Sequence, residues 1–250
     1  MKKVISIILV ALLCVSLCAC GSLSNDATKR KFVDTATDCN FSTLWNEQVD
    51  NPARAQSYCG QIFKVSGYIE YINEDHATIV PLDTPFNSLD SATVRIEAYF
   101  PNEDMVILSK FAAINFVGKV EEISGNYHGV TITMKEAFYI DDIIEITGEV
   151  QQFLYNMDHG CTQMEVHTAS QRRGDHLANL RATYYVKELG KLESHEQITV
   201  ARVSVRPGNT VKLTAKMTFA GLRYTSYTST IRDDHITFTI DEITSIEVIR

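Results

Sequence analysis

The residues of this sequence best suited to metal chemistry lie between positions 158 and 167. Histidine nitrogen and cysteine sulfur are the ligands that zinc prefers, and carboxylates can complete such a site. The stretch supplies all three in Asp158, His159, Cys161, Glu165 and His167. Its spacing matches no standard zinc site, however, and its opening Asp-His-Gly is also an ordinary turn sequence. A metal-dependent hydrolase is therefore kept as an alternative, and the expectation is that the protein holds no metal or other cofactor.

A second group of residues could bind a ligand without catalysis. Arg95, Glu97 and Tyr99 alternate along one predicted strand, and Tyr71 and Phe86 are expected nearby. Aromatic and arginine side chains stack against sugars or bases. The structural alternative is that Tyr71 and Phe86 pack the barrel while Arg95 and Glu97 pair across strands with other residues.

Two further tyrosines, Tyr224 and Tyr227, stand in a stretch of Thr and Ser residues between the last two predicted strands. An aromatic loop at that place could add contacts to a ligand. The alternative is a solvated hairpin.

Motifs of established catalytic sites are missing from the sequence, which has no Gly-x-Ser-x-Gly elbow, phosphate-binding loop or His-Glu-x-x-His pair. The acidic doublets Glu121-Glu122 and Asp141-Asp142 are interpreted as solvated strand ends. The sequence therefore favours a binding or interaction protein over an enzyme.

The start of the chain predicts export. Lys2 and Lys3 precede an apolar stretch from Val4 to Leu17, which is too short for a membrane span of about 20 residues. This is the pattern of a secretory signal. Its end, Leu-Cys-Ala-Cys at positions 17–20, resembles the lipobox of bacterial lipoproteins. The resemblance implies a signal peptide over residues 1–19, lipid on Cys20, and a protein anchored at the extracytoplasmic face of the cell membrane.

The charge of the mature chain limits its partners. Removing Lys2 and Lys3 leaves 21 basic against 31 acidic residues, a net charge of −10. Nucleic acid is an unlikely partner, because its binding depends on basic residues that replace phosphate counterions. The expected partners are the membrane, through the lipid, and an envelope protein, oligosaccharide or peptide.

The segment after Cys20 is polar and shows no period, so residues 20–38 are expected to form a flexible tether. Helical spacing and the Asn51-Pro52 pair predict short helices over residues 42–58. Cys39 and Cys59 flank these helices and could form a disulfide outside the cell, or remain thiols.

Alternation of apolar and polar residues predicts strands from Ile62 to Ile140. Five strands, with a short helix over 102–111 between the third and fourth, match the order of an OB barrel. Gly67 and Gly118 fall inside strands, where a missing side chain lets a small barrel bend.

The second half repeats the first. Val-Ser-Gly-Tyr-Ile at 65–69 resembles Ile-Thr-Gly-Glu-Val at 146–150, and two later segments correspond in the same order. The prediction is a mainly β protein of two tandem five-stranded OB-type barrels, with domain 1 at residues 39–143 and domain 2 at 144–250. Extra residues around 158–179, 189–209 and 221–233 are expected in loops. The two-residue linker Asp141-Asp142 predicts a rigid, elongated pair.

The first repeat also resembles a known group, the bacterial tRNA-anticodon-binding-like (tRNA_anti-like) OB-fold proteins, many of which are lipoproteins. The residues that carry the likeness are Asn51, Ala55, Tyr-Cys-Gly-Gln at 58–61, the Val65–Ile69 strand, and the strands from Ile114 and Val130. Gln61 departs from the lysine usual there. The likeness covers roughly residues 51–143 and implies a fold, not an activity.

Overall fold

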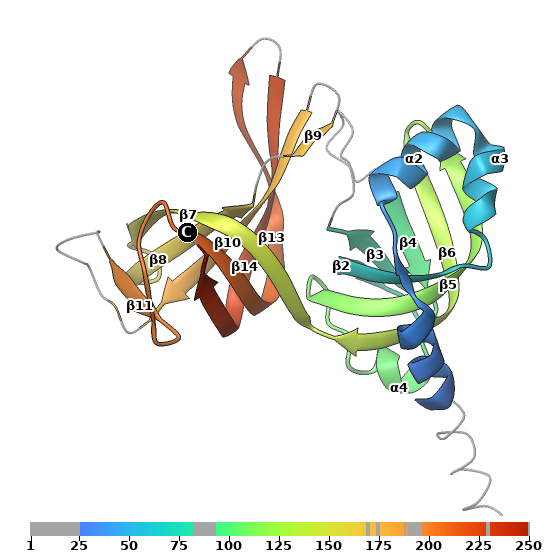
Figure 1. The fold of residues 1–250 in the computed structure, drawn as a ribbon, viewed down its shortest axis with the longest axis horizontal. Coiled ribbons are helices and arrows are strands. Elements are labelled where there is room, and N and C mark those ends of the chain that lie inside the picture. Colours follow the sequence, from blue (N-terminus) through green and yellow to red (C-terminus); the bar gives the residue numbers. More distant parts are fainter. Residues whose placement is uncertain are drawn as a thin grey trace, which may run out of the picture.

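A computed structural model describes residues 26–82, 94–168, 171–173, 176–187, 189, 197–228 and 231–249. Phe86 and the lipobox residues lie outside these ranges. The described chain is mainly β and contains two closed five-stranded barrels, which confirms the predicted fold class (Figure 1).

The first barrel closes through its first and fourth strands. Its strands run in the order β2-β3-β4-β6-β5, and β5 pairs again with β2. They span β2 Ile62–Ile72, β3 Ala77–Pro81, β4 Val94–Ala98, β5 Ala113–Asn126 and β6 Gly129–Asp141. The short helix α4, Asn102–Met105, lies between the third and fourth of these strands, as predicted. Inward residues such as Ile79, Ile96 and Ile132 are completely buried.

The second barrel has the same strand order and the same parallel pair between its third and fifth strands. Strand β10 pairs in parallel with β14, as β4 does with β6. The barrel strands are β7 Ile143–Asn156, β8 Cys161–Thr168, β10 His176–Val186, β13 Thr210–Thr228 and β14 Ile231–Val248. Three short strands are added outside the ring, namely β9 Gln171–Arg173, β11 Ile198–Val200 and β12 Val203–Val205. The shared topology agrees with the predicted duplication.

Two glycines explain how the first strand of each barrel approaches its neighbour. A Cβ added to Gly67 would lie 2.6 Å from Cγ2 of Ile79, and one added to Gly148 would lie 2.6 Å from the carbonyl oxygen of His167. Only glycine leaves room for such an approach.

The predicted helices before the first barrel are confirmed. Helix α2, Phe41–Asp50, begins after Asn40, whose side chain accepts a hydrogen bond of 2.9 Å from the backbone N of Thr43. Helix α3, Pro52–Ala55, and the 3₁₀ turn η1, Gln56–Tyr58, follow. The helices cover the first barrel, where Leu44 is fully buried. Cys39 and Cys59 are not bonded to each other.

The prediction of a flexible tether does not hold for the described part of residues 20–38. Residues 26–35 form a helix, and β1, Thr37–Asp38, pairs in parallel with β2. One apolar side chain explains the order: Phe32 is buried and meets Phe138 edge-on, with ring centroids 5.3 Å apart. The few apolar residues of this stretch, such as Leu23, Phe32 and Val33, show no helical period, so the pattern missed the helix.

The expected loop over residues 221–233 is also wrong for its described residues. Strands β13 and β14 continue through it as a long two-stranded hairpin that projects from the second barrel (Figure 1). The extra residues of 158–179 likewise include β8 and β9 rather than loop alone.

Candidate functional site

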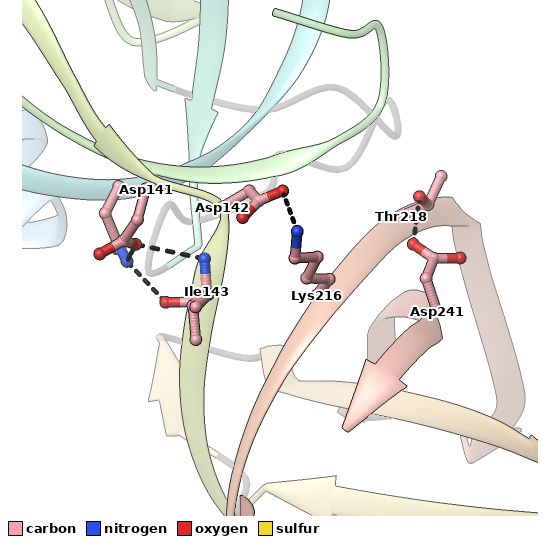
Figure 2. A network of polar contacts seen from close by, with 7 residues as sticks. Asp141, Asp142, Ile143, Lys216, Thr218 and Asp241 are labelled. Carbon is pink, nitrogen blue, oxygen red and sulfur yellow. Dashed lines mark hydrogen bonds and ion pairs between the residues drawn. The ribbon is translucent and has the colours of Figure 1, made fainter. Parts of the chain in front are cut away.

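The junction between the barrels is held by a polar network around one asparagine. Strand β6 ends at Asp141 and β7 begins at Ile143, so the last strand of the first barrel leads almost directly into the first strand of the second. The amide nitrogen of Asn115 donates to Oδ1 of Asp141 and to the carbonyl oxygen of Ile143, both at 2.7 Å. The same carboxylate accepts from the backbone N of Ile143 at 3.2 Å (Figure 2).

The second acidic residue of the junction reaches the other barrel. Asp142 forms an ion pair of 3.2 Å with Nζ of Lys216 on β13 (Figure 2). Asp141-Asp142 stands at a strand end, as expected, and the Asp142 side chain remains 39% exposed. The expectation missed that both carboxylates have specific partners, because the chain passes from one barrel into the next at this point.

An apolar contact forms the other half of the junction. The ring of Tyr68 on β2 stacks on that of Phe219 on β13, with centroids 4.1 Å apart, and Phe238 meets Tyr68 edge-on. The backbone N of Phe219 donates to the carbonyl oxygen of Phe111 at 2.8 Å. Phe111 itself has φ +70°, a strained conformation for a bulky residue. The expected rigid connection between the barrels is thus supported by packing as well as by the short linker.

This contact covers part of the outer surface of the first barrel. Tyr68, Val80 and Ala113 belong to its strands but are buried in the apolar cluster of the second barrel. OB barrels commonly bind ligands on their second and third strands and the adjoining loops. A region beside the third strand that the second barrel does not cover is named the open face here. Its residues are Glu70 and Tyr71 on β2, His76 in the turn before β3, Arg95 on β4, Tyr99 just after β4, and Lys135 on β6.

An ion pair fixes the centre of the open face. Nε of Arg95 on β4 donates to Oε2 of Glu70 on β2 at 2.7 Å, and Nη2 donates to Oε1 at 3.2 Å. The hydrogen bonds to Glu70 raise the pKa of Arg95 above its ordinary value. This is a pairing across strands, as the structural alternative expected for Arg95: the carboxylate comes from β2 and the guanidinium from β4.

Tyr99 lies between two basic groups. Nζ of Lys135 lies 3.3 Å from the centre of its ring, and the His76 ring stacks with it at a centroid distance of 5.1 Å. His76 is in turn held by Asp75, whose carboxylate is 2.7 Å from Nδ1, and by the Asn73 amide 2.8 Å from Nε2. The sequence did not indicate His76 or Lys135, because they come from a turn and from β6 and no local spacing connects them to Tyr99.

Tyr71 is 54% exposed, with Nζ of Lys110 lying 4.9 Å from its ring centre. The alternative in which Tyr71 packs the core is therefore wrong. Tyr224 and Tyr227 fall on β13 within the projecting hairpin, where Tyr224 pairs with Asp234. They lie on the other barrel from Arg95 and Tyr99, and Phe86 lies outside the described residues.

The candidate metal residues do not form one site. Cys161 and His167 are at opposite ends of β8, six positions apart, which corresponds to about 20 Å along a strand. The ring of His159 packs on that of Tyr185 instead, and Glu165 interacts with His167 at 3.5 Å. No group of three potential metal ligands occurs among the described residues. The same part of the chain contains no helix long and apolar enough to cross a membrane.

Comparison with known proteins identifies one family model, described as tRNA_anti-like, which matches residues 1–136. This match begins at residue 1, whereas the resemblance noted in the sequence covered roughly residues 51–143. No curated protein matches the chain. Among solved structures, a deletion mutant of the single-stranded DNA binding protein from Thermus aquaticus is similar over 76% of this chain and 93% of its own, with 10% identity and a TM-score of 0.24.

Proposed function

The chain belongs to the tRNA_anti-like family, and from that premise we propose that it is a lipid-anchored binding protein of the bacterial cell envelope. Family and OB fold favour binding over catalysis. The anchor is inferred from the signal and lipobox residues that end at Cys20. Lipid on this cysteine would hold both barrels at the extracytoplasmic face of the membrane.

One observation carries the binding role. The open face presents an aromatic ring between two basic groups, beside an arginine whose orientation is fixed by Glu70. Stacking side chains held in one geometry lose little entropy when a ligand binds. The second barrel leaves this region uncovered although it covers Tyr68 and Val80 nearby.

The chemistry of the face favours an uncharged or weakly charged ligand, such as an envelope oligosaccharide or a peptide. The Arg95 charge is already compensated by Glu70, and the mature chain has a net charge of −10. A polyanion such as nucleic acid would meet a repulsive field.

Photo-crosslinking in cells tests this role. A photoreactive phenylalanine analogue at Tyr71 should give an adduct, and the same analogue at Tyr155, a solvent-exposed tyrosine of the second barrel, should not. The Arg95→Ala/Tyr99→Ala variant should lose the Tyr71 adduct, whereas Lys212→Ala, which breaks an exposed ion pair elsewhere, should retain it. An Arg95→Ala/Tyr99→Ala variant that keeps the Tyr71 adduct would show that the open face does not bind.

The anchor has its own test. Cys20→Ser should abolish lipid labelling and release the protein from the membrane fraction. Unchanged labelling would mean that the lipobox interpretation is wrong, whatever the open face binds.

A structural spacer is the second candidate, because the junction joins the barrels through Asn115, Tyr68 and Phe219. A spacer needs the junction and not the open face. It therefore predicts a loss of cellular function in junction variants and none in Arg95→Ala/Tyr99→Ala. The metal-dependent hydrolase has no geometric support among the described residues.

A further inference from the structure

Two adjacent apolar side chains are held out into solvent at one end of the first barrel. Val106 and Ile107 follow α4 and are 84% and 57% exposed. Their neighbours Met105 and Leu108 pack against the barrel core. Backbone hydrogen bonds from Val106 to Asn102 and from Leu108 to Met105 give this segment a defined conformation. The exposure of the two side chains therefore results from the local fold.

The helix over residues 26–35 lies at the same end. It is the dark blue helix beside α4 in Figure 1. Electrostatics agree with this placement: burial raises the pKa of Asp104 on α4, while the positive charge of Lys29 acts in the opposite direction. Val33 is four positions after Lys29, so it lies on the same side of the helix, and it is also exposed. Val33, Val106 and Ile107, with the exposed Arg30 three positions before Val33, are called the anchor-side surface.

The length of the chain brings this surface close to the membrane. Five residues lie between Cys20 and Asp26, where the described helix begins. Even fully extended, the six steps from Cys20 to Asp26 span no more than about 22 Å. If Cys20 carries lipid, the anchor-side surface can never move far from the bilayer, and the tether gives it a high effective concentration there.

The charge of the helix over residues 26–35 permits contact with a membrane surface. Residues 26–35 contain three basic and two acidic residues, a net charge of +1, whereas the mature chain as a whole carries −10. Arg30 and Lys31 are exposed on this helix, as are Asp26 and Asp34. This part of the protein is therefore able to approach anionic headgroups that would repel most of its surface.

We propose that the anchor-side surface docks on the lipid bilayer. Val106 and Ile107 enter the interfacial region, and Arg30 contacts anionic headgroups. Apolar side chains next to basic ones are the combination that membrane interfaces favour. Docking gives the protein two attachment points, the lipid and this surface, and so restricts the orientation of the first barrel. The inference rests on the proposed lipidation of Cys20.

Site-specific labelling of the full chain tests the docking. Ile107→Cys and the control Met157→Cys, an 85% exposed position on the second barrel, are expressed separately. Membrane fractions are treated with a maleimide, before and after detergent, and the labelled peptides are quantified by mass spectrometry, which separates them from the native cysteines. In membranes, Ile107→Cys should react several-fold more slowly than Met157→Cys, and detergent should remove the difference. Adding Arg30→Glu should restore much of the reactivity.

The same mass spectra report the acyl group on the Cys20 peptide, so the two hypotheses fail in different ways. A lipidated protein in which both introduced cysteines react equally fast in membranes overturns the docking and leaves the anchor intact. A protein without lipid on Cys20 overturns both.

Discussion

The ring of Tyr68 in the first barrel lies flat on the ring of Phe219 in the second, with centroids 4.1 Å apart and planes inclined by 3°. Tyr68 is buried, and this burial raises the pKa of its phenol. It is part of the first barrel in the chain but of the second barrel's apolar cluster in space. The two cores therefore share a boundary, and we expect the barrels to unfold together.

Phe219→Ala should weaken this coupling. The change removes the ring that stacks on Tyr68 and should lower the free energy of unfolding by about 2–4 kcal/mol, since truncating a packed phenylalanine costs energy of this order. Urea unfolding measures it, and Met157→Ala, at an exposed position, is the control. Two separate transitions in the unmodified protein would contradict a single cooperative unit.

Asn115→Leu should be costly for a different reason. Its amide is a shared donor to Asp141 and to the carbonyl of Ile143. Removing it takes a donor from the half-buried carbonyl of Ile143 and leaves the Asp141 carboxylate with only the backbone N of Ile143 as a donor in this network, which costs about 1–3 kcal/mol. Lys216→Ala breaks only the more exposed pair with Asp142 and should cost about 1 kcal/mol or less. Equal losses in the two variants would argue against a special role for Asn115.

Gly148→Ala and Gly67→Ala should both destabilise the fold. The new Cβ of Gly148→Ala would meet a backbone oxygen at 2.6 Å, and that of Gly67→Ala the Ile79 side chain at the same distance. Overpacking of this kind costs about 1–3 kcal/mol. The Cβ of Gly67→Ala would also meet the backbone oxygen of Val80 at 2.8 Å, so similar losses are expected at the two positions. Thermal unfolding compares them with Lys64→Ala on an exposed strand position.

Asp104 should make stability depend on pH. Burial raises its pKa above the usual 3.8, so the folded protein retains this proton at pH values where the unfolded chain has lost it. The contribution of this group to stability is present below the unfolded pKa and is lost as pH rises through the folded pKa.

Asp104→Asn removes the titration and keeps an oxygen that accepts from the backbone N of Tyr139. Relative to the parent, the variant should gain stability as the pH rises from the unfolded pKa of Asp104 through its folded pKa. Urea unfolding measured at several pH values tests this. Asp75→Asn, at a fully exposed carboxylate, should show no such gain. A constant difference between Asp104→Asn and the parent at every pH would refute the assignment.

The sequence predicted the barrels because the inward residues of each strand alternate with outward ones, and because Gly67 and Gly148 mark the same tight approach in both copies. It predicted α2 and α3 from their helical spacing and the Asn51-Pro52 pair. It missed the helix over 26–35, whose order depends on one contact between Phe32 and Phe138, more than a hundred residues away.

The candidate site was predicted in part. Arg95, Tyr99 and Tyr71 were selected by residue type and strand position, and the structure places all three on or beside one uncovered surface. The sequence did not predict their partners Glu70, His76 and Lys135, because these residues come to the open face from other elements. The proposed metal residues show the reverse: they are close in the chain, but an extended strand separates Cys161 from His167.

Alternation along the chain by itself determined which side chains turn inward and which turn outward, and hence that two barrels form in tandem. Only the tertiary structure decided what covers the outward side chains. Tyr68 and Arg95 both point away from the first barrel. Tyr68 is buried under the ring of Phe219, whereas Arg95 remains accessible. The physical reason is that strand geometry sets the direction of a side chain locally, whereas its burial depends on packing against segments that come from anywhere in the chain.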